Sequence, residues 1–234
     1  MLHLSRFTGK NILLVGASGA FGSEFCNQLM LAGAAVLGTA SSNESSVRLR
    51  ADLTQRLLLN LEDAASVETL ANYLSSQNEP IDGIVLAAGL VAFGNITDTP
   101  HAVTERLLQV NALGQINLVQ RLLGKLQESA AAGREPFVLS ISGVIAEAPL
   151  PGLAAYSASK TAIHGYAQAA SKELRKAGIS WVDARPGHTE SGLAGRAIFG
   201  TAPNFGAGKT VPDVVARMLA GLTLGERDLP STAF

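Results

Sequence analysis

Short runs of apolar and β-branched residues recur along the chain, and each is followed by a longer segment with the apolar spacing of a helix. The runs are almost continuously apolar, which is typical of parallel strands covered on both faces. The pattern therefore predicts an α/β fold with a doubly wound parallel sheet between two layers of helices. The expected strands are Ile12–Val15, Ala35–Thr39, Leu57–Leu61, Ile84–Ala88, Phe137–Ile141 and Ile179–Ala184, and the expected helices lie near 20–32, 44–53, 63–77, 100–128 and 154–177.

The chain has no internal boundary in its composition. No Pro- or Ser-rich linker interrupts it, so we expect a single domain over residues 1–234. The segment 188–209 is different, because five glycines and one proline interrupt it. We expect this segment to be a mobile substrate loop that covers a site as a lid.

Composition narrows the class of protein. The 234 residues carry 18 Lys and Arg against 19 Asp and Glu, a net charge of −1, and this balance disfavours nucleic-acid partners. The longest apolar stretch, near residues 84–94, is shorter than the roughly 18 residues of a membrane helix. Cys26 is the only cysteine, so no intramolecular disulfide forms, and we expect it to be a buried small apolar residue. We expect a soluble, cytoplasmic protein.

The histidines give no metal site. His3, His101 and His164 have no partner at ligand spacing, and we interpret them as surface or helix residues. His188 differs from these three, because it directly follows Pro186-Gly187, and we expect it to line a pocket.

A glycine-rich turn follows the first expected strand. It reads Gly16-Ala17-Ser18-Gly19-Ala20-Phe21-Gly22 and leads into a helix. Glycines allow a tight turn and a close approach to a pyrophosphate, whose charge the first N–H groups of the helix attract. A ligand-free packed turn also favours glycine, but the place of this turn in a βαβ series favours a Rossmann-type dinucleotide site. We expect Gly16, Ser18, Gly19, Phe21 and Gly22 to bind the cofactor.

The end of the second expected strand bears on which cofactor binds. A carboxylate at this place accepts hydrogen bonds from the ribose of NAD and repels a 2′-phosphate. The chain has Thr39-Ala40-Ser41-Ser42 instead, so NADP(H) is favoured over NAD(H), with Thr39 and Ser41 as contacts. No Lys or Arg lies in the glycine turn, and Arg48 and Arg50 are equally well explained as solvated surface residues.

Tyr156 and Lys160 are four residues apart at the start of the expected helix 154–177, so they share one helix face. A neighbouring ammonium stabilises a phenolate, and lowering the tyrosine pKa from about 10 towards about 7 would allow acid–base catalysis at neutral pH. In an arbitrary helix the same spacing arises by chance.

Taken together, the motifs resemble the short-chain dehydrogenase/reductase family. The resemblance rests on the turn at 16–22, Asn60-Leu61, Ala88-Gly89, Asn111, Tyr156 with Lys160, and Pro186-Gly187, in this order along the chain. It implies that Tyr156 exchanges a proton with the substrate oxygen. It also implies that Lys160 binds the nicotinamide ribose and lowers the tyrosine pKa, and that Asn111 holds a water in a proton relay.

The same resemblance implies further contacts. The chain after Pro186 passes the nicotinamide, so His188 is expected to line the pocket, and Thr189 to reach the cofactor. The helices 100–128 and 154–177 are expected to pair between subunits in a homodimer or homotetramer. The expected cofactor-binding residues outside the turn are Thr39, Ser41, Asn60, Leu61, Ala88, Gly89, Lys160, Pro186, Gly187 and Thr189.

The chain departs from the family pattern at three places. Ala20 stands where a glycine is common, and Leu86-Ala87 replace two asparagines. Gly143 stands where the family has its catalytic serine, with Ser142 beside it. Either Ser142 takes over through a one-residue shift of the backbone, or it only caps the end of a strand and catalysis is weak.

The sequence thus predicts an NADP(H)-preferring oxidoreductase that interconverts a carbonyl and a secondary alcohol, with Tyr156, Lys160, Asn111 and Ser142 as catalytic residues. The substrate is expected to be small and largely apolar, because the lid offers Leu193, Ile198 and Phe199. The alternative is a cofactor-binding sensor or scaffold of the same fold with little turnover, which the missing serine favours.

Overall fold

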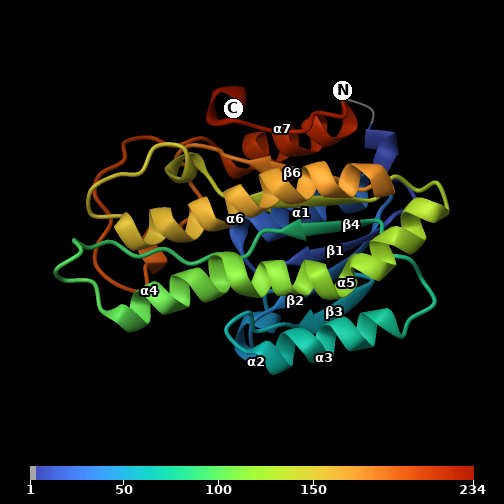
Figure 1. Ribbon diagram of the computed structural model, residues 1–234, viewed down its shortest axis with the longest axis horizontal. Coiled ribbons are helices and arrows are strands. Elements are labelled where there is room, and N and C mark those ends of the chain that lie inside the picture. Colours follow the sequence, from blue (N-terminus) through green and yellow to red (C-terminus); the bar gives the residue numbers. More distant parts are fainter. Residues whose placement is uncertain (1–3) are drawn as a thin grey trace.

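The computed structural model describes residues 4–234 and contains one six-stranded sheet. All neighbouring strands are parallel, in the order β3-β2-β1-β4-β5-β6 (Figure 1). The strands begin and end within about three residues of the expected ranges, which confirms the expected sheet. They are β1 (Asn11–Val15), β2 (Ala35–Ala40), β3 (Gln55–Leu58), β4 (Gly83–Leu86), β5 (Phe137–Ile141) and β6 (Ser180–Ala184).

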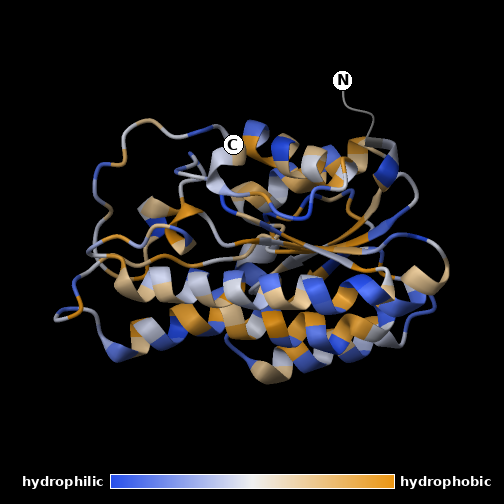
Figure 2. Cartoon of the chain, turned by 45° about the horizontal axis from the view of Figure 1, so that its top comes forward, coloured by the Kyte–Doolittle hydropathy of each residue, from blue (hydrophilic) through white to orange (hydrophobic). Residues whose placement is uncertain are grey.

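Helices cover both faces of the sheet, so the predicted three-layer α/β architecture is confirmed. One core lies under α3 (Ala64–Ser75), α5 (Gly114–Ala131) and α6 (Ala154–Leu174), and the other under α1 (Ala20–Leu31) and α7 (Val211–Thr223). Figure 2 shows the strands as the most hydrophobic part of the chain, with hydrophilic residues on the outer sides of the helices. Cys26 lies in the second core as expected, and burial raises the pKa of its thiol to about 11.

Three helical segments differ from the sequence-based expectation. The sequence pattern predicts no helix after residue 209, yet α7 begins at a Thr210 cap and buries one apolar face against the sheet. The helix expected at 44–53 is the short α2 (Asn43–Ser46), which a capping box at Ser42 starts. The helix expected at 100–128 consists of α4 (His101–Leu108), a π-helical turn at Gln109–Leu113, and α5.

The sheet changes direction of winding between β1 and β4, which are neighbours although β2 and β3 lie between them in sequence. In such sheets the crevice at the carboxyl ends of the strands at this point is the usual binding place. The segments that follow β1, β4, β5 and β6 therefore meet at one edge. Within residues 4–234, no helix combines the length and the apolar character needed to cross a bilayer.

Candidate active site

A pocket of about 920 Å³ opens at the carboxyl ends of the strands. It brings together nearly all the predicted site residues, from the glycine turn to the helix that carries Tyr156 and Lys160. Gly22 and Asn111 do not line it. The predicted residues that line it are Gly16, Ser18, Gly19, Phe21, Thr39, Ser41, Asn60, Leu61, Ala88, Gly89, Ser142, Tyr156, Lys160, Pro186, Gly187, His188 and Thr189.

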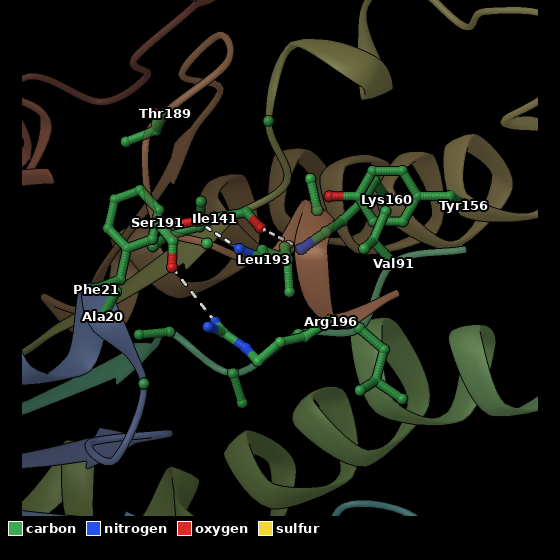
Figure 3. Close-up of a pocket in the computed structure, with 18 of the residues that line it drawn as sticks. Ala20, Phe21, Val91, Ile141, Tyr156, Lys160, Thr189, Ser191, Leu193 and Arg196 are labelled. Atoms are coloured by element: carbon green, nitrogen blue, oxygen red, sulfur yellow. Dashed lines mark hydrogen bonds between the residues drawn. The ribbon is translucent and has the colours of Figure 1, made fainter. Parts of the chain in front are cut away.

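The glycine turn is packed too tightly for side chains at two positions. Gly16 has a φ of +84°, and a Cβ there would lie 2.8 Å from the backbone nitrogen of Ala88. A Cβ at Gly22 would lie 2.1 Å from the Gly16 carbonyl oxygen, so Gly22 lets α1 pack against the turn. Gly19 is the N-cap of α1 and has no side chain to accept the first N–H groups of the helix. Ala20 and Phe21, the first residues of the helix, line the pocket (Figure 3), an arrangement that fits a pyrophosphate.

The end of β2 supports the turn. The Thr39 hydroxyl accepts a hydrogen bond from the Gly16 N–H at 3.1 Å, so its first role is structural. Arg48, which the sequence placed equally well in solvent, donates from Nε to the Ser18 carbonyl at 3.4 Å. This contact puts a guanidinium next to the turn.

The floor of the pocket is formed by backbone of β3, β4 and their loops. The Leu61 and Ala88 carbonyls accept hydrogen bonds at 3.0 Å from the side chains of Gln109 and Gln115, respectively. A Cβ at Gly89 would lie 3.5 Å from Lys160 Nζ, so a side chain there would crowd the ammonium. Glutamine side chains of the α4–α5 region thus hold the strand ends in place.

Tyr156 and Lys160 extend from α6 into the pocket (Figure 3). The Lys160 ammonium donates to the Ile141 carbonyl at 2.8 Å. Burial lowers the pKa of Lys160 to about 8, against the opposing charge of Asp183. At pH 7 the ammonium form of Lys160 therefore exceeds the amine about tenfold.

The expected lowering of the tyrosine pKa is wrong for the protein alone. Burial raises the pKa of Tyr156 to about 12, since its ring packs against the apolar cluster of Val91, Phe93, Ile145 and Leu153. The phenol therefore carries its proton at neutral pH, and the form that Tyr156 offers is an acid.

Asn111 lies in the π-helical turn and is fully buried. Its Oδ1 accepts from the Leu90 N–H at 2.8 Å, and its Nδ2 donates to the Leu90 carbonyl and the Ser159 hydroxyl, each at 2.9 Å. Both amide hydrogens are used, so the side chain fastens the segment after β4 to α6. Its part in a proton relay stays a prediction.

The Ser142 hydroxyl donates its hydrogen bond within the protein, so it is not free to donate to a substrate oxygen. It donates to Asp183 Oδ2 at 2.5 Å and is buried. Gly143 has φ +84° and ψ 163°, a backbone conformation that is essentially restricted to glycine. The backbone at Gly143 therefore disfavours a serine at that position, and the Ser142 hydroxyl is bonded to Asp183 instead of being shifted towards Tyr156 as expected.

The segment 188–209, which the sequence predicts to be a lid, has backbone hydrogen bonds between its two ends and in its middle. The Glu190 N–H donates to Lys209, and the Lys209 N–H donates to His188, both backbone bonds at 2.9 Å. The Ile198 and Phe199 backbones pair with residues 91–93, and neither side chain lines the pocket. Only Leu193 of the three apolar lid residues does.

The lid also contributes groups that the sequence did not single out. The Phe205 ring lies 5.1 Å from that of His188, centroid to centroid, and both residues line the pocket. Arg196 lines it too, with Nη2 donating to the Ser191 carbonyl at 3.3 Å (Figure 3). Thr189 donates its hydroxyl back to the Gly187 carbonyl at 3.0 Å.

His164 and Asp183 are the functional candidates that sequence reasoning missed. His164 was interpreted as a surface or helix residue, but its side chain is only 15% exposed and its Nδ1 lies 2.8 Å from Asp183 Oδ2. The distance in sequence between His164 on α6 and Asp183 on β6 does not predict their contact. The one sequence feature that could have pointed to this pair is an aspartate inside an otherwise apolar strand. His3 lies outside the described residues, and within 4–234 no cluster of His, Cys, Asp and Glu could hold a metal.

The sequence is similar to known dehydrogenases and oxidoreductases. The sequence is 27% identical over 239 residues to "Dehydrogenase/reductase SDR family protein 7-like" of Anopheles gambiae, covering 94% of this chain and 74% of that protein. It is 26% identical over 188 residues to "Probable oxidoreductase EphD" of Mycobacterium tuberculosis, and spans 31% of that protein's length.

Two solved structures share the fold. A 3-ketoacyl-(acyl-carrier-protein) reductase from Brucella melitensis, complexed with NADH, has a TM-score of 0.85 at 21% identity, with 97% of this chain and 99% of that chain covered. A short-chain dehydrogenase from Burkholderia cenocepacia, in complex with NADP, has a TM-score of 0.81 at 18% identity, with 96% and 88% covered.

The family model for short-chain dehydrogenases matches residues 10–198. This range contains the glycine turn, Asn111, Tyr156, Lys160 and Pro186. The chain therefore belongs to the short-chain dehydrogenase family of oxidoreductases.

Proposed function

We propose that this protein is an NADP(H)-dependent oxidoreductase that interconverts a carbonyl compound and a secondary alcohol. The observation that carries the proposal is a single pocket lined both by the N-terminus of α1 and by Tyr156 with Lys160. The nicotinamide cofactor, when bound, supplies the hydride that the substrate carbon gains on reduction. The backbone N–H groups at the start of α1, from Ala20 onwards, would hold its pyrophosphate, because the N–H groups of Gly16 and Gly19 already donate to Thr39 and to the Gly16 carbonyl.

Tyr156 supplies the proton in the direction of reduction. Its pKa of about 12 keeps the phenol protonated at neutral pH, so it donates a hydrogen bond to the carbonyl oxygen. As the carbon gains a hydride, charge develops on this oxygen and Tyr156 transfers its proton there. The Lys160 ammonium lies in the same pocket and stabilises the phenolate that remains.

The preference for NADP(H) rests on the charge near the end of β2. No carboxylate lies in the segment 39–42, and the Arg48 guanidinium reaches the carbonyl of Ser18. A 2′-phosphate near Ser41 would meet hydroxyl groups and this cation. We assign Ser41 and Arg48 to the 2′-phosphate.

The substrate is small and largely apolar. This part of the proposal is supported by Val91, Phe93, Ile145 and Leu153, which pack together and line the pocket next to Tyr156. Leu150 and Leu193 extend the apolar wall. The apolar character thus comes mainly from the loops after β4 and β5, and Ile198 and Phe199 take no part in it.

The test is to follow NADPH consumption with a panel of ketones, aldehydes and quinones that carry small apolar groups. The reverse reaction is followed with the matching alcohols and NADP⁺. We expect turnover of at least one small apolar carbonyl, and lower turnover of the same compound carrying a carboxylate. Tight NADPH binding without turnover anywhere in the panel would contradict the enzyme assignment.

A cofactor-binding sensor or scaffold is the second candidate function. The observation that favours it is the pair Ser142 and Gly143, which offers the substrate oxygen no side-chain hydroxyl. In acyl-transfer enzymes, the loss of one hydrogen-bond donor to the developing oxyanion costs about 2.7–4 kcal/mol of transition-state stabilisation. The two candidates differ in turnover with NADPH, which the panel measures directly.

We also propose that the protein is a homodimer or homotetramer. Leu113, between α4 and α5, is 56% exposed, and it lies on a helix pair that the family resemblance assigns to subunit contacts. Light scattering coupled to gel filtration checks the mass, and Leu113→Asp is expected to shift it towards the monomer.

A further inference from the structure

Asp183 is a buried carboxylate that the proposed reaction does not use. It lies on β6 and is 3% exposed. Its Oδ1 accepts from the Ser140 hydroxyl at 2.7 Å, and its Oδ2 accepts from the Ser142 hydroxyl at 2.5 Å and pairs with His164 Nδ1 at 2.8 Å. Donors from β5 and α6 therefore converge on one side chain, which is what a buried charge requires.

Two of these partners are connected to Lys160, one through its hydrogen-bond acceptor and one through its helix. Ser142 directly follows Ile141, whose carbonyl accepts the Lys160 ammonium at 2.8 Å. His164 follows Lys160 by one helical turn on α6, so the two side chains share a face. Asp183 thus ties the acceptor of the ammonium to the helix that carries it.

Arg185 forms an ion pair with Asp183, but it shares its charge with two other carboxylates. Arg185 Nη1 is 3.3 Å from Asp183 Oδ2, but the guanidinium makes shorter contacts, at 2.7 and 2.6 Å, with the Asp228 carboxylate and also donates to Glu147. The negative charge of Asp183 opposes the lowering of the Lys160 pKa by burial. The charged or titratable groups around Asp183 are Lys160 and His164 on α6, Arg185 after β6 with its partners Glu147 and Asp228, and Lys172 and Arg227 at an outer cavity.

We propose that Asp183 is the positioning residue for Lys160, holding the Ile141 carbonyl through Ser142 and the α6 backbone through His164 so that the ammonium stays charged and aimed into the pocket. The proposal rests on the proposed function for its consequence in catalysis. Its effect on Lys160 exists in the protein whether or not a substrate is known.

A second cavity offers access to this residue from outside the pocket. It has a volume of about 180 Å³ and is lined by Asp183, Asp228, Trp181 and one face of α6. A small carboxylate such as formate fits in this volume. Removal of the Asp183 side chain would therefore leave a site that formate can fill from solvent.

The first experiment measures the titration of Lys160 in the unliganded protein by NMR of lysine labelled with ¹³C at Cε. The signal is assigned by its loss in Lys160→Met. In the wild type we expect a midpoint near pH 8. In Asp183→Asn we expect the midpoint to fall by about one pH unit, because the opposite charge is removed.

Asp228→Asn is the matched control. It removes a carboxylate from the same outer cavity and from Arg185, but Asp228 makes no contact with Ser142 or His164 among the bonds of the described residues. We expect the Lys160 midpoint to stay within about 0.2 of the wild-type value. An equal shift in both variants would overturn the proposal, as would no shift in Asp183→Asn.

The second experiment covers the case in which Asp183→Asn folds poorly. Asp183→Ala is measured with and without formate, with acetamide as the uncharged control. We expect formate alone to move the Lys160 midpoint back towards pH 8 and to raise NADPH affinity. Rescue by acetamide as well would show that filling the space is sufficient and would contradict a role for the charge.

A third variant separates geometry from charge. Ser142→Ala keeps the carboxylate but removes one tie, so we expect kcat to fall several-fold with KM nearly unchanged, and Ser142→Thr to restore it. If the panel finds no substrate, the NMR titrations still decide the role of Asp183. An unchanged Lys160 midpoint in Asp183→Asn, together with normal turnover, would reject the inference and leave the proposed function intact.

Discussion

The two ends of the pocket are built in different ways. At the α1 end, glycines and backbone N–H groups make the surface, and side chains such as Thr39 only hold the turn in place. At the α6 end, the surface depends on side chains in a hydrogen-bond network: Lys160 donates to the Ile141 carbonyl, and the next residue, Ser142, donates to Asp183. A backbone-built site tolerates almost no added volume, whereas a side-chain network is sensitive to charge and to single hydrogen bonds.

The largest effect is expected from Tyr156→Phe, which changes one hydroxyl at the side-chain end. Because the variant removes only the proton donor, we expect kcat to fall by about 10²–10⁴-fold. NADPH affinity should stay within about twofold, since the phenyl ring keeps its place in the apolar cluster. Steady-state kinetics and calorimetry measure the two quantities. Retention of more than about a tenth of the wild-type kcat would refute Tyr156 as the acid.

Gly22→Ala tests the backbone end. The new Cβ would lie 2.1 Å from the Gly16 carbonyl oxygen, so the turn or α1 must move. We expect the free energy of unfolding to fall by about 3 kcal/mol, and NADPH binding to be lost with it. Chemical denaturation and calorimetry provide the measurements.

Gly124→Ala is the control for this variant, because Gly124 also lies in a helix but a Cβ there would meet nothing within 4 Å. We expect this substitution to stabilise the protein by roughly 0.5–1 kcal/mol. Equal stabilities of the two variants would show that the close packing of the turn is unimportant.

Gly143→Ser places the family's hydroxyl back at the side-chain end. The backbone at Gly143 has φ +84°, so we expect a loss of about 1–3 kcal/mol in stability and no gain in kcat. Thermal denaturation and kinetics with the best substrate of the panel check both. A stable variant with higher kcat would mean that the natural protein is an impaired enzyme.

Ser41→Asp returns to the cofactor end and tests the preference between the two cofactors. An added carboxylate repels a 2′-phosphate, so NADPH affinity should fall about tenfold relative to NADH, or about 1.4 kcal/mol. Competition binding of the two cofactors measures the ratio. Preferential loss of NADH binding, or a wild type that prefers NADH, would contradict the NADP(H) assignment.

The contrast also explains what the sequence could and could not predict. The sheet, the glycine turn and the Tyr156–Lys160 pair follow from local spacing, because strands, turns and helix faces repeat at fixed periods. The bonds of Asp183 to Ser142 and His164 join residues 41 and 19 positions apart, and no period encodes them. The direction of the Tyr156 pKa was wrong for the same reason, since it depends on the apolar cluster that surrounds the ring.

The backbone pairing of His188 and Glu190 with Lys209 has a consequence for how such a protein changes over generations. Because both ends of the segment 188–209 are paired with each other, we expect insertions or deletions at 201–207, beyond the pairing of Ile198 and Phe199 with residues 91–93, to leave the sheet and α6 undisturbed. Doubling the length of a flexible loop costs only about 0.6 kcal/mol of closure entropy. The segment 188–209 is therefore the part of the pocket lining that we expect to change, and with it the range of substrates, with the least loss of stability.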